Sequence, residues 1–252
     1  MGQDMEGGRA RTGTDPPRRA AIARRPAGHR APVRAGRLHD PAAGAEPHIR
    51  ARGTATLVRT EPQAVNEVIR AAADLQAFCI AHRWRFCFIG GVAVQRWGEP
   101  RETIDVDVTL ATGLGHEDAY IEPLVATFEA RIDDAGEFAR AHRVLLLRAK
   151  SGVGFDIALG GLPYEETVVD RSSLFLFPPD VPLRTCSAED LIVLKAFAAR
   201  EKDWVDIDGV IIRQAGVIDW PYVREHLGPL VELKEEPEIL DELERRRAKL
   251  EM

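Results

Sequence analysis

The order of apolar and polar positions divides the chain after its first fifty residues. Residues 1–53 contain hardly any Val, Ile, Leu or aromatic residue and are rich in Arg, Pro, Gly and Ala. Such a segment cannot bury enough apolar surface to offset the entropy lost on ordering, so we expect residues 1–55 to form a disordered extension. An arginine-rich tail is also able to bind RNA, but an unstructured extension, or upstream sequence from a misplaced start, is the simpler interpretation.

Helical periodicity begins directly after this segment. From Glu61 to His82 apolar residues recur at intervals of three and four, which predicts an amphipathic helix with Pro62 in its first turn. The apolar stripe consists of Val65, Val68, Ile69, Ala72, Leu75, Phe78 and Cys79. This helix leads into an apolar run that begins at Phe86 and is expected to be a strand.

The segment Phe86–Leu110 is predicted to form a strand, a glycine turn, a short helix, a loop and a second strand. The second strand carries Asp105 and Asp107, and because strand side chains alternate, both carboxylates point to one face. Two carboxylates this close together are unfavourable unless a cation neutralises them. The pair Gly90-Gly91 lets the backbone approach a bulky anion, since neither residue has a Cβ atom. The segment therefore predicts a phosphate cradle beside a divalent metal site.

The remaining pattern is mixed up to about residue 185 and helical beyond it. Asp156 lies in the second strand of a predicted hairpin, and Ser187 with Asp190 resembles a capping box at the first of the later helices. The predicted elements are a helix Glu117–Phe128, a weak strand Ala130–Asp133, strands Val144–Leu147 and Val153–Leu159, a short helix Pro163–Val169, short strands Phe175–Phe177 and Val181–Thr185, and helices from Ser187, Trp204–Arg213, Pro221–Leu227 and Pro237–Leu250.

Composition and cysteine usage favour a globular protein of the cytoplasm. Of the 252 residues, 45% are hydrophobic and 29% charged, which is ordinary for such a protein. No apolar run approaches the roughly 20 residues that span a bilayer, and no apolar stretch follows the N-terminal arginines as in a secretory signal. The cysteines Cys79, Cys87 and Cys186 show no CxxC spacing and are expected to be reduced core residues.

The net charge of −6 is unevenly distributed. Residues 1–53 hold eleven arginines and five acidic residues, so the remaining chain is more acidic than the total suggests. An acidic body argues against a broad nucleic-acid-binding surface, which would depend on many phosphate contacts. A local basic groove remains compatible with this charge distribution.

Three carboxylates are the strongest candidates for chemistry. Apolar residues flank each of Asp105, Asp107 and Asp156, so each strand has one core face and one acidic face. Oxygen ligands of this kind favour Mg²⁺ or Mn²⁺, and a pair of such ions activates an attacking oxygen and stabilises a leaving pyrophosphate. The alternative is a solvated face of an edge strand. The preceding glycine pair and the following strand aspartate favour the metal site.

Five sequence motifs of the chain resemble those of a known family. They are Gly90-Gly91, Arg101-x-Thr103-x-Asp105-x-Asp107, Asp156, Ala188-Glu189-Asp190-Leu191 through Lys195, and Arg200-x-Lys202-Asp203-x-x-Asp206. Over roughly residues 64–215 the chain resembles the nucleotidyltransferase superfamily of the DNA polymerase β type, and within it the AbiEii-like toxin branch. The resemblance implies an α+β fold with a small mixed nucleotidyltransferase sheet flanked by helices. Together with the composition of the N-terminal segment, it divides the chain into a disordered extension at 1–55, a catalytic domain at 56–186 and a helical region at 187–252.

The resemblance assigns roles to the carboxylates and glycines. Gly90 and Gly91 are expected to approach the phosphates of a nucleoside triphosphate (NTP), and Asp105 and Asp107 to hold Mg²⁺ or Mn²⁺. Asp156 is expected to be a further metal ligand or the base that activates the acceptor hydroxyl. Many members of the superfamily have serine at the second cradle position. Here Gly91 leaves only backbone N–H groups for the phosphates.

The helical motif supplies the remaining candidates. Lys195 borders an apolar stripe, and the resemblance favours phosphate binding over a solvated lysine. Asp203 either orients Lys195 or caps the helix at Trp204, and Asp206 is spaced to face the same side of that helix. Arg101 is a candidate phosphate contact, against the simpler interpretation of an exposed loop arginine.

The function that the resemblance implies is transfer of a nucleoside monophosphate from an NTP to a hydroxyl acceptor. In the toxin-like branch the acceptor is RNA, tRNA in particular, or a protein, and a cognate antitoxin is the expected partner. One alternative is an antibiotic-type enzyme with a small-molecule acceptor, which suits the acidic body somewhat better. Another is a catalytically silent nucleotide-binding or interaction module, against which the presence of all three carboxylates argues.

Overall fold

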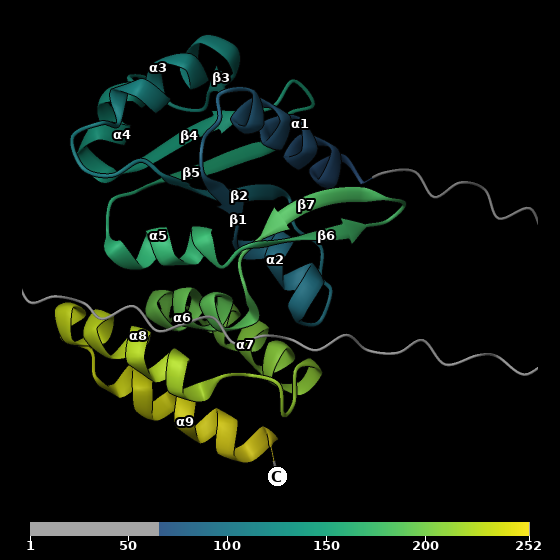
Figure 1. Cartoon of the computed structure of the whole chain (residues 1–252), viewed down its shortest axis with the longest axis vertical. Coiled ribbons are helices and arrows are strands. Elements are labelled where there is room, and N and C mark those ends of the chain that lie inside the picture. Colours follow the sequence, from purple (N-terminus) through teal and green to yellow (C-terminus); the bar gives the residue numbers. More distant parts are fainter. Residues whose placement is uncertain (1–65, 252) are drawn as a thin grey trace, which may run out of the picture. The chain divides into compact units, whose positions relative to one another are not determined.

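A computed structural model describes residues 66–251 (Figure 1). The predicted extension over residues 1–55, and residues Glu61–Val65 of the first predicted helix, lie outside this range. Within it, seven strands form one sheet in the order β3-β4-β5-β2-β1-β7-β6. The strands are β1 (Phe86–Phe88), β2 (Asp105–Ala111), β3 (Glu129–Ala130), β4 (Val144–Arg148), β5 (Gly154–Gly160), β6 (Ser173–Phe177) and β7 (Val181–Thr185). The predicted α+β class is confirmed.

The sheet is mixed. Strand β2 pairs in parallel with β5 and antiparallel with β1, and β1 pairs in parallel with β7. The pairs β3–β4, β4–β5 and β6–β7 are antiparallel, so the hairpin predicted around Ser151-Gly152 is confirmed. The central pairing of β2 with β5 places two strands with aspartates side by side.

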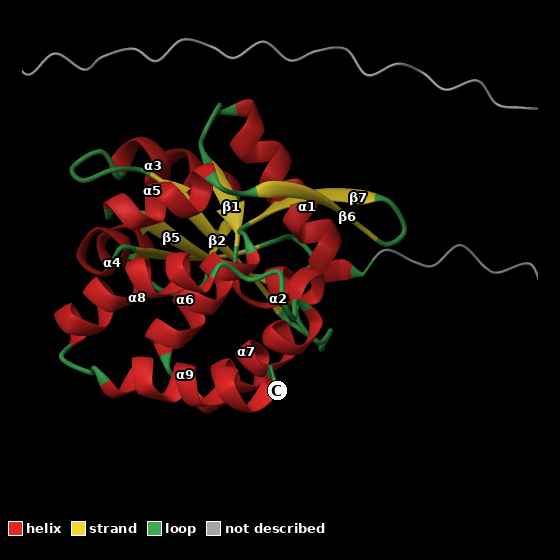
Figure 2. Cartoon of the chain, turned by 60° about the horizontal axis from the view of Figure 1, so that its bottom comes forward, coloured by secondary structure: helices red, strands yellow, loops and turns green. Residues whose placement is uncertain are grey.

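Helices cover both faces of the sheet (Figures 1 and 2). They are α1 (Glu67–Ala81), α2 (Gly90–Trp97), α3 (Asp118–Thr127), α4 (Ala135–His142), α5 (Pro163–Asp170), α6 (Ala188–Ala198), α7 (Glu201–Arg213), α8 (Trp220–Lys234) and α9 (Glu238–Leu250). None of the helices in residues 66–251 is both long and apolar enough to cross a bilayer. Helix α1 begins with a side-chain cap, because Asn66 Oδ1 accepts a hydrogen bond from the N–H of Val68 at 2.8 Å.

The alternation of side chains along β2 builds two separate cores. Val106, Val108 and Leu110 point to one face and pack with residues of α1, α3 and α4. On the other face, residues of α2 and α5 pack with the C-terminal helices α6 to α9 in a second cluster. Asp105 and Asp107 point to this second face, because they alternate with the apolar residues of β2. The C-terminal helices thereby come to lie opposite the aspartates.

A fully buried carboxylate joins the C-terminal helices to α5. The hydroxyls of Tyr222 and Tyr164 donate to Oδ1 of Asp190 at 2.6 and 3.1 Å, and Ser187 and Arg171 donate to Oδ2 at 2.7 and 3.2 Å. Ser187 also caps α6 as predicted, since its Oγ accepts from the N–H of Asp190 at 3.1 Å. Asp190 is therefore a link between helices in addition to being part of the cap.

Several elements differ from the sequence-based expectation. Helix α1 begins at Glu67, whereas the predicted helix began at Glu61, β3 is Glu129–Ala130 where Ala130–Asp133 was expected, and α8 continues to Lys234, beyond the predicted end at Leu227. The helix α4 was not predicted, because its eight residues include only two buried apolar positions, Ala135 and Ala139. Helix α7 begins at Glu201, three residues before the predicted start at Trp204. This earlier start places Asp203 inside the helix.

The three cysteines of the chain are core residues. Cys79, Cys87 and Cys186 are free and buried, as predicted, and burial raises the pKa of the Cys79 thiol to about 12.

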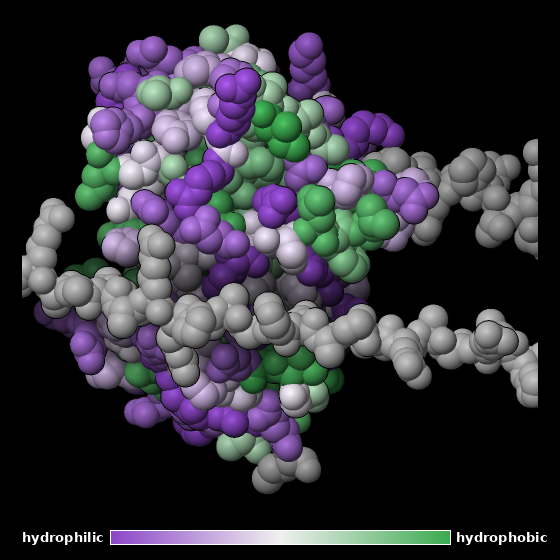
Figure 3. Space-filling view, in the orientation of Figure 1, coloured by the Kyte–Doolittle hydropathy of each residue, from purple (hydrophilic) through white to green (hydrophobic). Residues whose placement is uncertain are grey.

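At the sheet edge, β6 exposes apolar side chains, with Leu174 and Leu176 more than half exposed. An apolar patch is visible over the β6–β7 hairpin in Figure 3.

Candidate active site

The chain turns sharply where β1 ends and α2 begins. Gly90 has a φ of 54°, and a Cβ atom at this position would lie 2.0 Å from Oδ2 of Asp107. A Cβ atom on Gly91 would lie 2.3 Å from Oγ1 of Thr103. Glycine suits both places in this chain, because the first turn of α2 lies against the side chains of Asp107 on β2 and of Thr103 in the loop before it. The glycines were predicted to form a turn before the helix, but they are the first two residues of α2, with Ile89 as the N-cap.

The three aspartates face one cavity of about 470 Å³. Asp107 is the direct partner of Asp156 across the parallel β2–β5 pair, and Asp105 is two residues earlier on the same face. Burial, followed by the charges of Asp105 and Asp156, raises the pKa of Asp107. The N–H of Gly91, which points to Oδ2 of Asp107 at 3.4 Å, opposes this shift only in part. The site is therefore short of positive charge near Asp107.

The predicted lysine lies on the other side of the same cavity. Lys195 on α6 is 6% exposed, and its Nζ lies 3.0 Å from Oδ1 of Asp203 and 2.6 Å from Oδ2 of Asp206, both on α7. Asp203 is not the N-cap of α7, because Arg200 holds that position. Of the two interpretations weighed for Asp203, contact with Lys195 is the one observed.

Two arginines complete this buried network. Arg101 donates from Nε and Nη2 to the two carboxylate oxygens of Asp206 at 2.7 and 2.9 Å, and Arg200 donates from Nε to Asp203 at 2.5 Å. Burial alone would raise the pKa of both aspartates. Hydrogen bonds from the arginines and from Lys195 outweigh burial and hold the pKa of Asp203 and of Asp206 below the usual range. Arg101 is thus a bidentate partner of Asp206 as well as a residue of the cavity wall.

Every site residue predicted from the sequence lines this cavity. They are Gly90, Gly91, Arg101, Asp105, Asp107, Asp156, Lys195 and Asp203. Asp206 lies behind Lys195 and Arg101. The wall also contains Thr103, Arg200 and Lys202, together with apolar side chains of α6.

The carboxylates at the cavity are chemically suited to bind a divalent cation. Asp105 and Asp107 offer hard oxygen ligands on one face, beside a backbone cradle that a Cβ atom would fill. As they stand, no three His, Cys, Asp or Glu side chains between residues 66 and 251 form a cluster arranged to hold a metal ion. The third carboxylate is engaged elsewhere, because Oδ1 of Asp156 accepts a hydrogen bond from Nη1 of Arg131.

Arg131 was not predicted as a site residue from the sequence. It lies 25 residues before Asp156 and has no motif around it. The two residues meet only because β3 and β5 both flank β4 in the sheet. No signal available from spacing alone would have found this contact.

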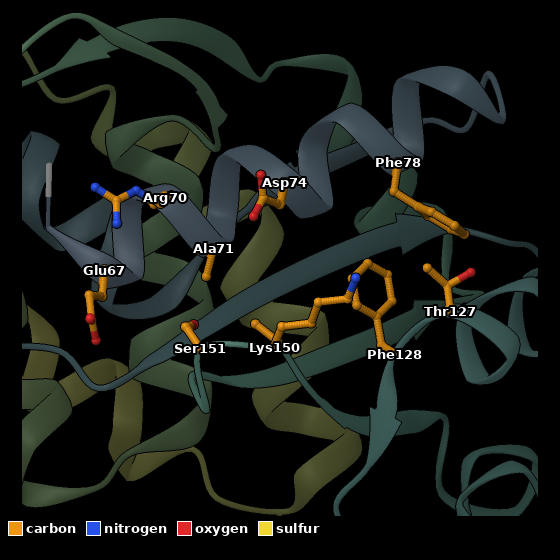
Figure 4. A pocket seen from close by; sticks show the side chains of 10 residues that line it. Glu67, Arg70, Ala71, Asp74, Phe78, Thr127, Phe128, Lys150 and Ser151 are labelled. Carbon is orange, nitrogen blue, oxygen red and sulfur yellow. The ribbon is translucent and has the colours of Figure 1, made fainter.

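A second cavity of about 450 Å³ lies on the other face of the sheet (Figure 4). It is bounded by α1, the end of α3 and the β4–β5 turn, and Phe78 and Phe128 form part of its wall. Its charged residues, Glu67, Arg70, Asp74 and Lys150, are exposed and lie at its margin. It contains none of the predicted site residues.

Residues 75–213, more than half of the chain, match the family model described as nucleotidyl transferase AbiEii toxin, type IV TA system. The chain belongs to this AbiEii family. The match spans the glycine pair, all three aspartates and the Lys195 network, and it identifies the protein as a nucleotidyltransferase. No curated protein matches the sequence.

Several solved structures are similar to this AbiEii family member at low identity. An antigenic nucleotidyltransferase-like protein from Paracoccidioides brasiliensis is 15% identical, with 73% of this chain and 95% of that chain covered and a TM-score of 0.43. The antibiotic-resistance factor ANT(2'')-Ia is 15% identical, covering 72% and 89% with a TM-score of 0.38. The lincosamide antibiotic adenylyltransferase LnuA is also 15% identical, covering 56% and 94% with a TM-score of 0.38.

Proposed function

We propose that the protein is a metal-dependent nucleotidyltransferase that moves a nucleoside monophosphate from an NTP to a hydroxyl group of RNA, as the toxin of a toxin–antitoxin pair. The observation that supports this most strongly is the shared cavity. Three aspartates on β2 and β5 face Lys195 and its carboxylate partners across about 470 Å³. This arrangement brings anionic metal ligands and phosphate-binding cations to one place.

The triphosphate binds between the cradle and the helical wall. The first turn of α2, at Gly90 and Gly91, offers the phosphates the partial positive charge of a helix N-terminus. Lys195 supplies a full positive charge, and Asp203 and Asp206 hold its ammonium in place. Arg200 is 61% exposed in its side chain and extends the positive wall toward solvent.

Asp105 and Asp107 would hold Mg²⁺ or Mn²⁺, and the cation would supply neutralisation of the charge on the phosphates and on the leaving group. The acceptor oxygen attacks the α-phosphorus, the bond to the bridging oxygen breaks, and pyrophosphate leaves with both electrons of that bond. Asp156 either accepts the proton of the acceptor hydroxyl or adds a further metal ligand. Both roles need its carboxylate close to Asp107, and the strand register places it there.

The family description supports the choice of partner. The matching family is described as a toxin of a type IV toxin–antitoxin system, which supports a cognate antitoxin. For the acceptor we propose tRNA or another RNA of the cytoplasm. We assign catalysis to residues 56–186 together with the Lys195 side of the region 187–252. Lys202, and the exposed guanidinium of Arg200 that also pairs with Asp203, are the cavity-wall cations that would meet the phosphates of an RNA end.

The test is a transfer assay with the full chain. Purified protein is incubated with Mg²⁺, each α-³²P-labelled NTP in turn, and one acceptor class: tRNA, total protein or an aminoglycoside. Label in tRNA with release of pyrophosphate, lost in Asp105→Asn, is the expected result. Label in protein or in the aminoglycoside would show that this molecule, and not RNA, is the acceptor. No label with any acceptor would leave a silent binding module as the function.

A further inference from the structure

The contact between Arg131 and Asp156 stands apart from the other charged contacts of the cavity. Arg131 directly follows β3, and its backbone N–H donates to the carbonyl of Leu146 on β4 at 3.1 Å. Its guanidinium passes over Gly154, where a Cβ atom would lie 2.9 Å from Nη1, and reaches Oδ1 of Asp156. The absence of a side chain at Gly154 leaves room for this contact.

Arg131 approaches the acidic face from the far side. The cations Arg101, Lys195 and Arg200 pair with Asp203 and Asp206 on the helical side. In the described part of the chain, Arg131 is the only basic residue in an ion pair with any of the three strand aspartates. It therefore occupies a cation position next to the carboxylate that the metal site needs.

We propose that Arg131 competes with a divalent cation for Asp156 in the nucleotide-free protein, and thereby makes metal binding depend on nucleotide. This inference rests on the metal site of the proposed function. The three strand aspartates carry up to three negative charges, and the guanidinium offsets one of them. A divalent cation entering alone is repelled by Arg131 and finds one oxygen of Asp156 engaged. When the cation arrives with a triphosphate, the negative charge of the triphosphate offsets the repulsion by Arg131. The same charge draws the guanidinium away from Asp156 and frees its oxygen.

The pair is suited to being displaced. The side chains of Arg131 and Asp156 are 30% and 35% exposed, so water screens their attraction and the pair contributes little to stability. The guanidinium lies next to solvent and can leave without opening the core. Arg131 is thus a positioning residue that acts on the metal through Asp156.

The test measures Mn²⁺ binding to the full chain by the electron paramagnetic resonance signal of free Mn²⁺. The variants are Arg131→Gln, Arg131→Lys and the matched control Arg140→Gln. Arg140 also pairs with an aspartate, Asp118, but lies on α4 over the other face of the sheet. Without nucleotide, Arg131→Gln is expected to lower the Kd for Mn²⁺ about tenfold, as for a double and a single charge about 6 Å apart in water. Arg131→Lys and Arg140→Gln keep the wild-type Kd.

A second titration includes a non-hydrolysable ATP analogue with a methylene bridge between the α- and β-phosphates. The difference between wild type and Arg131→Gln is expected to shrink to less than threefold, because nucleotide has already displaced the guanidinium. An unchanged or higher Kd for Arg131→Gln without nucleotide overturns the inference. If the inference about Arg131 fails in this way but Mn²⁺ binds to wild type and Asp105→Asn abolishes the binding, the metal site of the proposed function is still supported. If Mn²⁺ binds to neither wild type nor Arg131→Gln, the metal site of the proposed function fails as well.

Discussion

The ammonium of Lys195 lies 2.6 Å from Oδ2 of Asp206, with only 6% and 4% of the two residues exposed. Arg101 holds both oxygens of the same aspartate from the loop before β2. The contact therefore ties α6 and α7 to the segment that carries the strand aspartates. Lys195 cannot turn away from the cavity without leaving two buried carboxylates short of a partner.

Replacing Lys195 with methionine tests this dependence. The variant keeps most of the length of the side chain but removes the positive charge that faces Asp203 and Asp206. It should lower the free energy of unfolding by about 3 kcal/mol and abolish transfer. Urea unfolding and the transfer assay measure the two effects. Lys249→Met, at an exposed position of α9, should change neither. Wild-type stability in the Lys195 variant would contradict the network.

Acid should weaken the same network. The pKa values of Asp203 and Asp206 are lower in the folded state than in the unfolded chain. Their contribution to the free energy of unfolding is therefore complete above the unfolded pKa of about 3.9. It is lost as the pH falls through the folded values. Unfolding free energies measured between pH 6 and pH 2.5 should fall steeply below about pH 4. Asp206→Asn should be less stable at pH 6 and show a flatter curve; a parallel curve would contradict this account.

The contribution of Asp107 to the free energy of unfolding should have the opposite pH dependence. Burial, with the charges of Asp105 and Asp156, raises its pKa, so its carboxylate is unfavourable at neutral pH and the penalty disappears as the pH falls through the raised pKa. Asp107→Asn should raise the unfolding free energy of the metal-free protein at pH 7 while abolishing transfer. At pH 3 the gain should vanish. A variant that is less stable at pH 7 would refute the argument.

The glycine cradle has a matched control in the chain. Gly90 and Gly113 both have positive φ, but a Cβ atom at Gly90 meets Asp107 at 2.0 Å and one at Gly113 meets nothing within 4 Å. Gly113→Ala should cost about 1 kcal/mol for its left-handed backbone and leave transfer intact. Gly90→Ala should cost more and raise the KM for NTP at least tenfold. Equal effects of the two substitutions would remove the cradle from the account.

Much of the fold was predictable because its signals are local. The alternation of apolar residues around Asp105, Asp107 and Asp156 identified β2 and β5 and the face that each carboxylate takes. The stripe of α1 and the cap at Ser187 were equally clear. Helix α4 was missed because its apolar face is small, and tertiary contacts with the sheet stabilise it.

The site was predictable only in its parts. Spacing indicated which aspartates share a face, but the pairing of Asp107 with Asp156 depends on the parallel register of β2 and β5. Asp203 had two equally good interpretations until the start of α7 showed that Arg200 is the cap. Arg131 had no signal at all, because only the order of strands in the sheet brings it to Asp156.

The most direct test of the central claim compares two labels of one nucleotide. The full chain is incubated with Mg²⁺, tRNA and an NTP labelled with ³²P at either the α- or the γ-phosphate. Nucleotidyl transfer through Asp105, Asp107 and Lys195 predicts that only the α label enters the acceptor, while the γ label appears in pyrophosphate. Entry of the γ label into the acceptor, or equal α labelling by Asp105→Asn, would contradict the account.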